Sequence, residues 1–309
     1  MAASNQTQRI FMTGATGYIG SVITELAIAE GYEVHGLSRA DSGDAKLLKA
    51  GAVPVRGNLT TLDILRKESS KADIVFHLAT AYSARSTGTY DDAWPTDKAA
   101  IEAIADGLEG SNKPLIVTGG TLYVAPDPNG GETTEMSPMN PNPFNTRSQS
   151  ETHALELAKK SIRVIAMRLA PWVFGRGGSG VKLFMGMSKM SGAVTCVDGG
   201  KSRTTTVHVD DVARLYLLAA QKAKSGEIFN AASSTVVTFH QIWETMATAL
   251  NLPLKDLSIE EATGTVGPAL AKFISAENRA SGAKARNVLG WKPSDADILE
   301  EIHSVASQM

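Results

Sequence analysis

The sequence predicts an α/β fold: a Rossmann-type, doubly wound parallel sheet with a smaller, mostly helical C-terminal lobe. Short runs rich in Val, Ile and Leu alternate with helical patterns from the start of the chain, and such repeated βα units favour a parallel sheet. A glycine-rich turn follows the first run. An eight-fold barrel would place its phosphate site late in the chain, whereas this glycine cluster comes first. The doubly wound sheet is therefore the better prediction.

The predicted strands are apolar runs without alternation, as expected where helices cover both faces of a sheet. They cover residues 9–13, 33–37, 53–55, 73–78, 115–118 and 164–169. After the first strand, Ile19, Val22, Ile23 and Leu26 recur at the spacing of one helix face. Further helices are expected over 96–108 and 148–160.

The pattern changes after about residue 175. We expect residues 1–175 to form a nucleotide-binding domain and 176–309 a substrate-binding lobe, with about 204–234 returning to the sheet. Residues 204–220 resemble a strand leading into a helix, and 228–231 resemble another strand. The long loop 126–143 carries five prolines, and 175–180 is dense in glycine. Loops of that length are usually functional or disordered.

Composition excludes several classes of protein. Thirty Lys and Arg against 32 Asp and Glu leave a net charge of −2, whereas nucleic-acid binders concentrate positive charge. Cys196 is the only cysteine, so an intramolecular disulfide is impossible and a reducing compartment fits best. No apolar stretch approaches the roughly 18 residues of a membrane span. The sequence predicts a cytoplasmic protein with a small-molecule substrate, and neither a nucleic-acid nor a membrane partner.

The turn after the first strand has the spacing of a dinucleotide cradle. Gly14 permits the tight turn, Gly17 lets the backbone approach a pyrophosphate, and Gly20 allows close packing of helix and strand. The helix N-terminus then offers unpaired N–H groups to the phosphates. Thr16, Tyr18 and Ile19 belong to the same predicted site.

The end of the second strand indicates NADP rather than NAD. NAD binders place a carboxylate there for the ribose hydroxyls, but this chain has Ser38 and Arg39. A guanidinium can hold a 2′-phosphate with paired N–H donors; a solvated surface cation is the alternative. Asn58 and Leu59 follow the third strand and are predicted to meet the adenine. A turn-forming role explains Asn58 nearly as well.

With these motifs, the chain resembles an atypical, extended short-chain dehydrogenase/reductase of the NAD-dependent epimerase/dehydratase group. The motifs that carry the resemblance are Thr13-Gly14-Ala15-Thr16-Gly17-Tyr18-Ile19-Gly20, His77-Leu78-Ala79, Arg168-Leu169-Ala170-Pro171-Trp172-Val173-Phe174-Gly175, Val207-His208-Val209-Asp210-Asp211-Val212-Ala213 and Asn230-Ala231-Ala232. The resemblance implies cofactor contacts along the ribose and nicotinamide. The residues concerned are Leu78, Ala79, Thr80, Pro171 and Val173.

The catalytic signature of that family departs from its usual form here. The family carries a serine and then Tyr-x-x-x-Lys, with the tyrosine as general acid/base. Alignment places Arg147 at the lysine position and Pro143, or Phe144 after a one-residue slip, at the tyrosine position. Neither of the latter can transfer a proton. Arg147 can bind the nicotinamide ribose, but it stays protonated and cannot act as a base.

Other groups must then supply the chemistry. Gly119 occupies the serine position, and the hydroxyls of Thr118 and Thr121 on either side can polarise a substrate carbonyl or stabilise the turn. Tyr82 and Tyr123 follow the fourth and fifth strands, at the edge where ligands bind in such sheets. They are candidate proton donors or lining residues.

Two further groups bear on the ligand. Arg176 and Arg203 can meet an anionic or carbonyl-rich substrate. The six histidines show no metal-site spacing, so no metal is expected.

These residues predict an NADP(H)-binding oxidoreductase that reduces a carbonyl, imine or activated double bond of a small apolar metabolite. One alternative is a redox-silent isomerase, lyase or cyclase that keeps NADP as a structural group. A second is a non-catalytic NADP(H) sensor that binds a partner protein. The resemblance also implies a homodimer.

Overall fold

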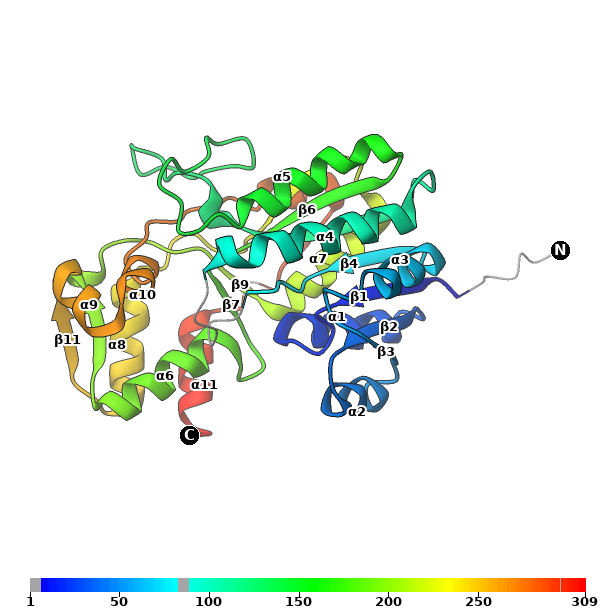
Figure 1. Ribbon diagram of the computed structural model, residues 1–309. Coiled ribbons are helices and arrows are strands. Elements are labelled where there is room, and N and C mark those ends of the chain that lie inside the picture. Colours follow the sequence, from blue (N-terminus) through cyan, green and yellow to red (C-terminus); the bar gives the residue numbers. More distant parts are fainter. Residues whose placement is uncertain (1–6, 83–88, 295) are drawn as a thin grey trace. The chain divides into compact units, whose positions relative to one another are not determined.

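The computed structural model describes residues 7–82, 89–294 and 296–309, and it contains a seven-stranded sheet (Figure 1). The strand order is β10-β6-β5-β4-β1-β2-β3. The strands are β1 (Arg9–Thr13), β2 (Glu33–Ser38), β3 (Val53–Arg56), β4 (Ile74–His77), β5 (Pro114–Gly120), β6 (Arg163–Leu169) and β10 (Ile228–Ala231). β1 pairs in parallel with β2 and β4, β2 with β3, and β4 with β5. The predicted Rossmann-type α/β fold is confirmed.

Helices follow the strands as the βα pattern predicts. They are α1 (Tyr18–Ala29), α2 (Asp41–Lys49), α3 (Leu62–Lys71), α4 (Tyr90–Leu108), α5 (Ser148–Glu156) and α7 (Val209–Lys222). α3 and α4 pack side by side, and Phe11, Val75 and Ile104 lie in the apolar core that these elements share (Figure 1). A 3₁₀ turn, Leu157–Lys160, continues α5 to the predicted end.

The start of α4 differs from the expectation over 96–108, because the helix begins six residues earlier, at Tyr90. Thr89 caps it: its hydroxyl accepts from the Asp92 backbone N–H, and the Asp92 carboxylate accepts from the Thr89 N–H. This capping box satisfies two of the N–H groups that a helix start leaves unpaired. Pro95 lies inside the helix, so the expected start at residue 96 was wrong.

The chain forms two compact units, each assembled from three segments. The first contains residues 1–119, 145–168 and 213–229, and the second contains 120–144, 169–212 and 230–309. The expected boundary at residue 175 stays a prediction. In the second unit, two short parallel pairs join β7 to β9 and β8 to β11. Its elements are β7 (Trp172–Phe174), α6 (Ser179–Ser191), β8 (Val194–Val197), β9 (Thr206–His208), α8 (Phe239–Leu250), β11 (Leu254–Leu257), α9 (Ile259–Val266), α10 (Pro268–Phe273) and α11 (Ile298–Ala306).

The second unit has its own core, in which Trp172, Phe184 and Trp243 pack with ring centroids 5.2–5.7 Å apart. None of the helices in the described ranges is both long enough and apolar enough to cross a bilayer.

Candidate active site

The turn between β1 and α1 has no room for side chains at Gly14 and Gly20. Gly14 has φ +77°, a conformation that side chains disfavour, and a Cβ there would lie 3.0 Å from the backbone nitrogen of Ala79. A Cβ on Gly20 would overlap the carbonyl oxygen of Gly14. Gly17 is the N-cap residue of α1, is exposed, and provides no side-chain cap. The start of α1 therefore carries no side-chain cap, and a helix start of this kind fits a dinucleotide diphosphate.

The other predicted residues of this turn differ in exposure. Thr16, Tyr18 and Ile19 are half-buried, so each exposes part of its surface at the start of α1. Their contact with a cofactor stays a prediction.

The end of β2 presents a cation and keeps its neighbouring acids engaged. Arg39 is exposed, and no carboxylate in the described ranges forms an ion pair with it. Asp41 and Asp44, at the start of α2, both accept hydrogen bonds from Arg56. Ser38 is buried and donates its hydroxyl hydrogen to the Ala40 carbonyl over 3.0 Å. The segment after β2 therefore offers the guanidinium of Arg39, whereas its nearby carboxylates are bonded to Arg56.

Asn58 makes the local turn that the sequence also allowed. Its side-chain oxygen accepts from the backbone N–H and from the hydroxyl of Thr60, both at 2.7 Å. Leu59 is buried in the core of the first unit. Contact of these two residues with adenine stays a prediction.

A small pocket opens at the carboxyl ends of β4 and β5. Among its lining residues are four that the sequence predicted for the site, namely Ala79, Thr80, Thr118 and Arg147. Leu78 lies beside it, with its Cβ 3.2 Å from the place that a Cβ on Gly14 would take. Because Ala79 both lines the pocket and contacts Gly14, the glycine turn and the pocket are neighbours within one unit.

His77 lines the same pocket and is held as a neutral ring. Its Nδ1 lies 2.8 Å from the hydroxyl of Thr13, and its side chain is buried. Burial, assisted by the positive charge of Arg147, lowers the pKa of His77 to about 4. His77 is thus uncharged at neutral pH and does not add a second cation beside Arg147.

The hydroxyl of Thr118 is already engaged on both sides. It donates to the carbonyl of His77 over 2.9 Å and lies 2.7 Å from the Tyr216 hydroxyl. Since its only hydrogen goes to His77, Tyr216 is the donor of the second bond. Burial raises the pKa of Tyr216 well above its ordinary value. The predicted role of Thr118 in polarising a substrate requires it to give up its bond to His77.

Asp97, on α4, fixes the segment that follows β4. Its carboxylate accepts from the Thr80 hydroxyl and the Ala81 backbone N–H, both at 2.6 Å. The Thr80 hydroxyl hydrogen is consequently committed to Asp97. Sequence inspection missed Asp97 because it lies within a helix whose pattern indicates only an amphipathic surface.

Tyr90 is a second residue that the sequence did not suggest. It is the first residue of α4, and its ring stacks on Tyr82, with ring centroids 3.8 Å apart and planes 19° from parallel. The Arg147 guanidinium acts on its phenol through charge and a side-chain hydrogen bond. The capping-box pattern beginning at Thr89 is the sequence signal that could have placed Tyr90 at a helix start.

The remaining predicted site residues belong to the second unit. Thr121 is buried and donates to the side-chain oxygen of Asn278 over 3.0 Å, and Tyr123 is buried as well. Val173 lies on β7, opposite Val207 on β9, and Pro171 is half-buried just before β7. Their roles in cofactor binding and proton transfer stay predictions.

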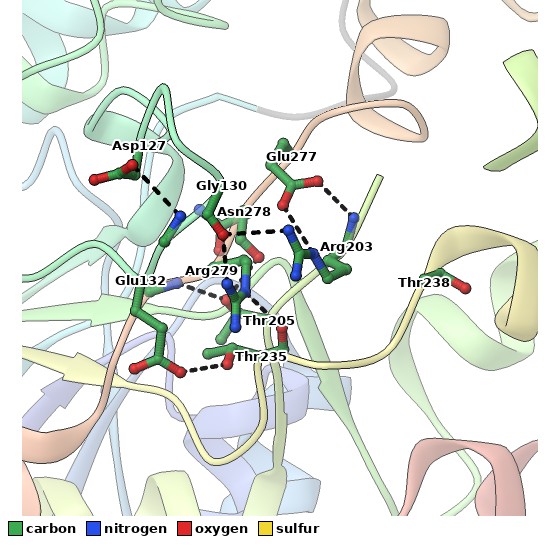
Figure 2. A network of polar contacts seen from close by, with 12 residues as sticks. Asp127, Gly130, Glu132, Arg203, Thr205, Thr235, Thr238, Glu277, Asn278 and Arg279 are labelled. Carbon is green, nitrogen blue, oxygen red and sulfur yellow. Dashed lines mark hydrogen bonds and ion pairs between the residues drawn. The ribbon is translucent and has the colours of Figure 1, made fainter. Parts of the chain in front are cut away.

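Arg203 and Arg176 both face carboxylates of their own unit. Figure 2 shows Arg203 and Arg279 converging on the carbonyl of Gly130, with Glu277 bonded to Arg203. Arg176 donates to Asp210 over 2.6 Å. These pairs tie the proline-rich loop and the glycine segment to the second unit, so an anionic ligand would have to compete with a carboxylate at each site.

Known proteins resemble this chain in sequence and in fold. The model of the NAD dependent epimerase/dehydratase family matches residues 10–232. An uncharacterized protein of Schizosaccharomyces pombe is 34% identical over 299 residues, which is 96% of this chain and 99% of that protein. A ketoreductase of Stigmatella aurantiaca, which acts on 4-hydroxy-2-methyl-3-oxo-4-farnesyl-3,4-dihydroquinoline-1-oxide, is 25% identical across 72% of this chain and 67% of its own.

Among solved structures, UDP-glucose 4-epimerase of Thermotoga maritima has the same fold, with a TM-score of 0.78 at 20% identity and coverage of 97% of this chain and 98% of that one. The match of the family model over most of the chain, together with the full-length relative, assigns the protein to a family. The chain belongs to the NAD dependent epimerase/dehydratase family.

Proposed function

We propose that the protein is an NADP(H)-dependent oxidoreductase that reduces a carbonyl, imine or activated double bond of a small apolar metabolite. The observation that carries this proposal is the adjacency of the glycine turn and the pocket through Ala79. The turn would hold the diphosphate of a dinucleotide, and Ala79 and Thr80 would line the pocket for the group that reacts.

Different residues of the first unit would bind different parts of the dinucleotide. The turn from Gly14 to Gly20 would hold the diphosphate, and Arg147 would donate to the hydroxyls of the ribose beside the pocket. When bound, the reduced nicotinamide supplies a hydride. Asp97 keeps the segment at Thr80 in place, and the neutral ring of His77 leaves Arg147 as the dominant local charge.

The proposed preference for NADP over NAD rests on Arg39, in the segment after β2. Arg39 is free of carboxylates in the described chain, and Arg56 holds Asp41 and Asp44. A phosphate on the adenosine ribose therefore meets an available guanidinium, which binds phosphate with paired N–H donors. The similarity to a ketoreductase supports reduction of a carbonyl as the type of reaction.

Calorimetry and a reduction assay test the proposal together. We expect NADPH to bind more tightly than NADH, and NADPH absorbance to fall with at least one member of a panel of aldehydes, ketones, imines and enones. The variant Gly20→Val, which places a side chain against the Gly14 carbonyl, should lose both signals. Gly264→Ala is a control, since open space surrounds that residue and its backbone does not need a positive φ.

Failure to bind either nucleotide would overturn the proposal. Conversion of a ligand without any consumption of NADPH would instead support the redox-silent enzyme. Different affinities of a partner protein for the NADP- and NADPH-loaded forms, with no turnover, would support the sensor.

A further inference from the structure

We propose that Tyr90 donates the proton in this reaction and that Arg147 stabilises the phenolate that remains. The inference rests on the proposed function, since it names the acid for the reduction. In the pattern Tyr-x-x-x-Lys the acid and the cation lie on one helix. Here they come from two helices, with the phenol at the start of α4 and the guanidinium just before α5.

The helix geometry directs Tyr90 toward the pocket. Residues seven positions apart lie on one helix face, as do residues four apart. Tyr90, Asp97 and Ile101 have these spacings, and Asp97 and Ile101 line the pocket. Tyr90 therefore lies on the face of α4 that borders the pocket.

A hydrogen bond between the two segments keeps the pair together. The hydroxyl of Thr146 donates to Asp91, the neighbour of Tyr90 on α4. Next along the chain, the backbone N–H of Arg147 donates to the side-chain oxygen of Asn145 over 3.0 Å. These bonds set the approach of Arg147 to the first turn of α4.

Among the hydroxyl groups near the pocket, the phenol of Tyr90 is the best proton donor. Thr80 and Thr118 line the pocket, but their hydrogens are committed to Asp97 and His77. Ser150 also lines it, but an alkyl hydroxyl is a much weaker acid than a phenol. A guanidinium only donates, so its hydrogen bond with Tyr90 uses the phenol oxygen as acceptor and leaves the phenolic hydrogen available. Across the described ranges, Tyr90 donates to no protein acceptor.

Charges around the phenol suit a general acid at neutral pH. Burial raises the pKa of Tyr90, Arg147 opposes that increase, and Tyr82 and Asp97 add to it. The phenol thus stays protonated until substrate takes the hydrogen, and Arg147 then faces the new negative charge. Tyr216 is a poorer candidate because it is fully buried and already donates to Thr118.

The proton passes from the Tyr90 hydroxyl to the carbonyl oxygen of the substrate. As the hydride reaches the carbonyl carbon, the electron pair of the C=O π bond moves to oxygen, which takes the hydrogen from the Tyr90 hydroxyl. The O–H bond of Tyr90 breaks, its electron pair stays on the phenolate beside Arg147, and solvent later returns a proton.

Tyrosine variants provide the kinetic test. Tyr90→Phe keeps the ring that stacks on Tyr82 but removes the acid, and we expect kcat to fall about 100-fold or more with NADPH affinity unchanged. Tyr32→Phe is the matched control, because the Tyr32 hydroxyl is exposed and accepts from Gln221. Arg147→Lys should recover part of the rate that Arg147→Gln loses.

A titration of the phenol provides a readout that needs no turnover. Trifluorotyrosine placed at position 90 ionises near neutral pH, where fluorine NMR follows it in the folded, nucleotide-free protein. Arg147→Gln should move that ionisation to higher pH, whereas the same label at position 32 should not respond.

The outcomes separate this inference from the proposed function. If NADPH binds and carbonyls are reduced but Tyr90→Phe keeps its rate, or Tyr82→Phe alone abolishes it, Tyr90 is not the acid. An ionisation at position 90 that ignores Arg147→Gln would refute the pair, even if no substrate has been found. Loss of nucleotide binding by the unmodified protein would instead refute the proposed function.

Discussion

Arg147 is the residue around which the pocket is organised. Its charge acts on His77, Tyr90 and Tyr216, and it forms no ion pair with a carboxylate of the described chain. A half-buried cation without an acid is costly unless a ligand or a developing charge compensates it. An alignment suggests a cation at this position, but sequence spacing alone does not show which side chains surround it.

Arg39 is predicted to decide between the two cofactors. Arg39→Ala should weaken NADPH binding about 10- to 100-fold, because hydrogen bonds to a charged group contribute about 1.5–3 kcal/mol. NADH binding should change little, since NADH lacks the 2′-phosphate. Calorimetry measures both affinities, with Arg66→Ala as the control for removing an exposed arginine elsewhere. Equal losses for NADPH and NADH would show that Arg39 does not read the phosphate.

His77 is predicted to make stability depend on pH. Its pKa is about 4 in the folded protein and 6.5 ordinarily, so the unfolded chain binds the extra proton first as pH falls. The free energy of unfolding is therefore unaffected by His77 above pH 6.5. Between pH 6.5 and pH 4 it falls progressively, by about 3 kcal/mol in all.

Urea unfolding at several pH values checks this prediction. The free energy of unfolding of the native protein should fall more steeply below pH 6.5 than that of His77→Gln. Parallel curves for the two proteins would show that His77 does not titrate differently on folding.

At the scale of elements, the ion pair of Glu151 and Arg168 joins α5 to β6. Arg168 Nη2 and Nε donate to the carboxylate over 2.6 and 3.1 Å, and both side chains are about 4% exposed. Glu151 lies one helical turn after Arg147. The pair therefore fixes the helix whose start presents Arg147 to the pocket.

Breaking this pair is predicted to destabilise the protein strongly. Glu151→Gln leaves a buried guanidinium without its counter-charge and should cost about 3–5 kcal/mol. Asp63→Asn, which breaks an exposed pair with Arg66 on α3, should cost less than about 1 kcal/mol. Denaturant unfolding compares them, and similar losses for the two variants would contradict the role given to Glu151.

Element boundaries show which parts of the fold the sequence could predict. Strand β1 was predicted with its observed bounds because an unbroken apolar run ends at a glycine turn. The start of α4 lies six residues before the expected one, because the capping box at Thr89 begins the helix ahead of Pro95. β8 and β11 were not predicted, because Thr195 in β8 and the pair Lys255-Asp256 in β11 interrupt the apolar run.

At the scale of the whole molecule, the candidate site is less predictable than the fold. Local patterns identify the glycine turn, Arg39 and the strand ends, because each is determined by neighbours in the sequence. Tyr90 and Arg147 are distant in the chain, and only the packing of α4 and the bonds at Thr146 bring them together. Hydrogen-bond partners such as Asn278 for Thr121 are equally remote.

The division of the chain yields a prediction about fragments. The first unit needs residues 213–229, which supply the body of α7 and the start of β10. Tyr216 on α7 packs edge-on against Phe76, with ring centroids 5.6 Å apart, and bonds to Thr118. A fragment of residues 1–175 loses this helix and an edge strand of the sheet, so β6 and an apolar face become exposed.

We therefore expect fragment 1–175 to lack a cooperative thermal transition and to bind no NADPH. Fragment 1–231 contains every segment of the first unit and ends with β10, and it should recover a cooperative transition by circular dichroism. The full chain provides the reference. If the shorter fragment unfolds cooperatively and binds nucleotide as well as the longer one, α7 and β10 do not stabilise the sheet, because the five strands β1 to β5 together with β6 then suffice to bury its core.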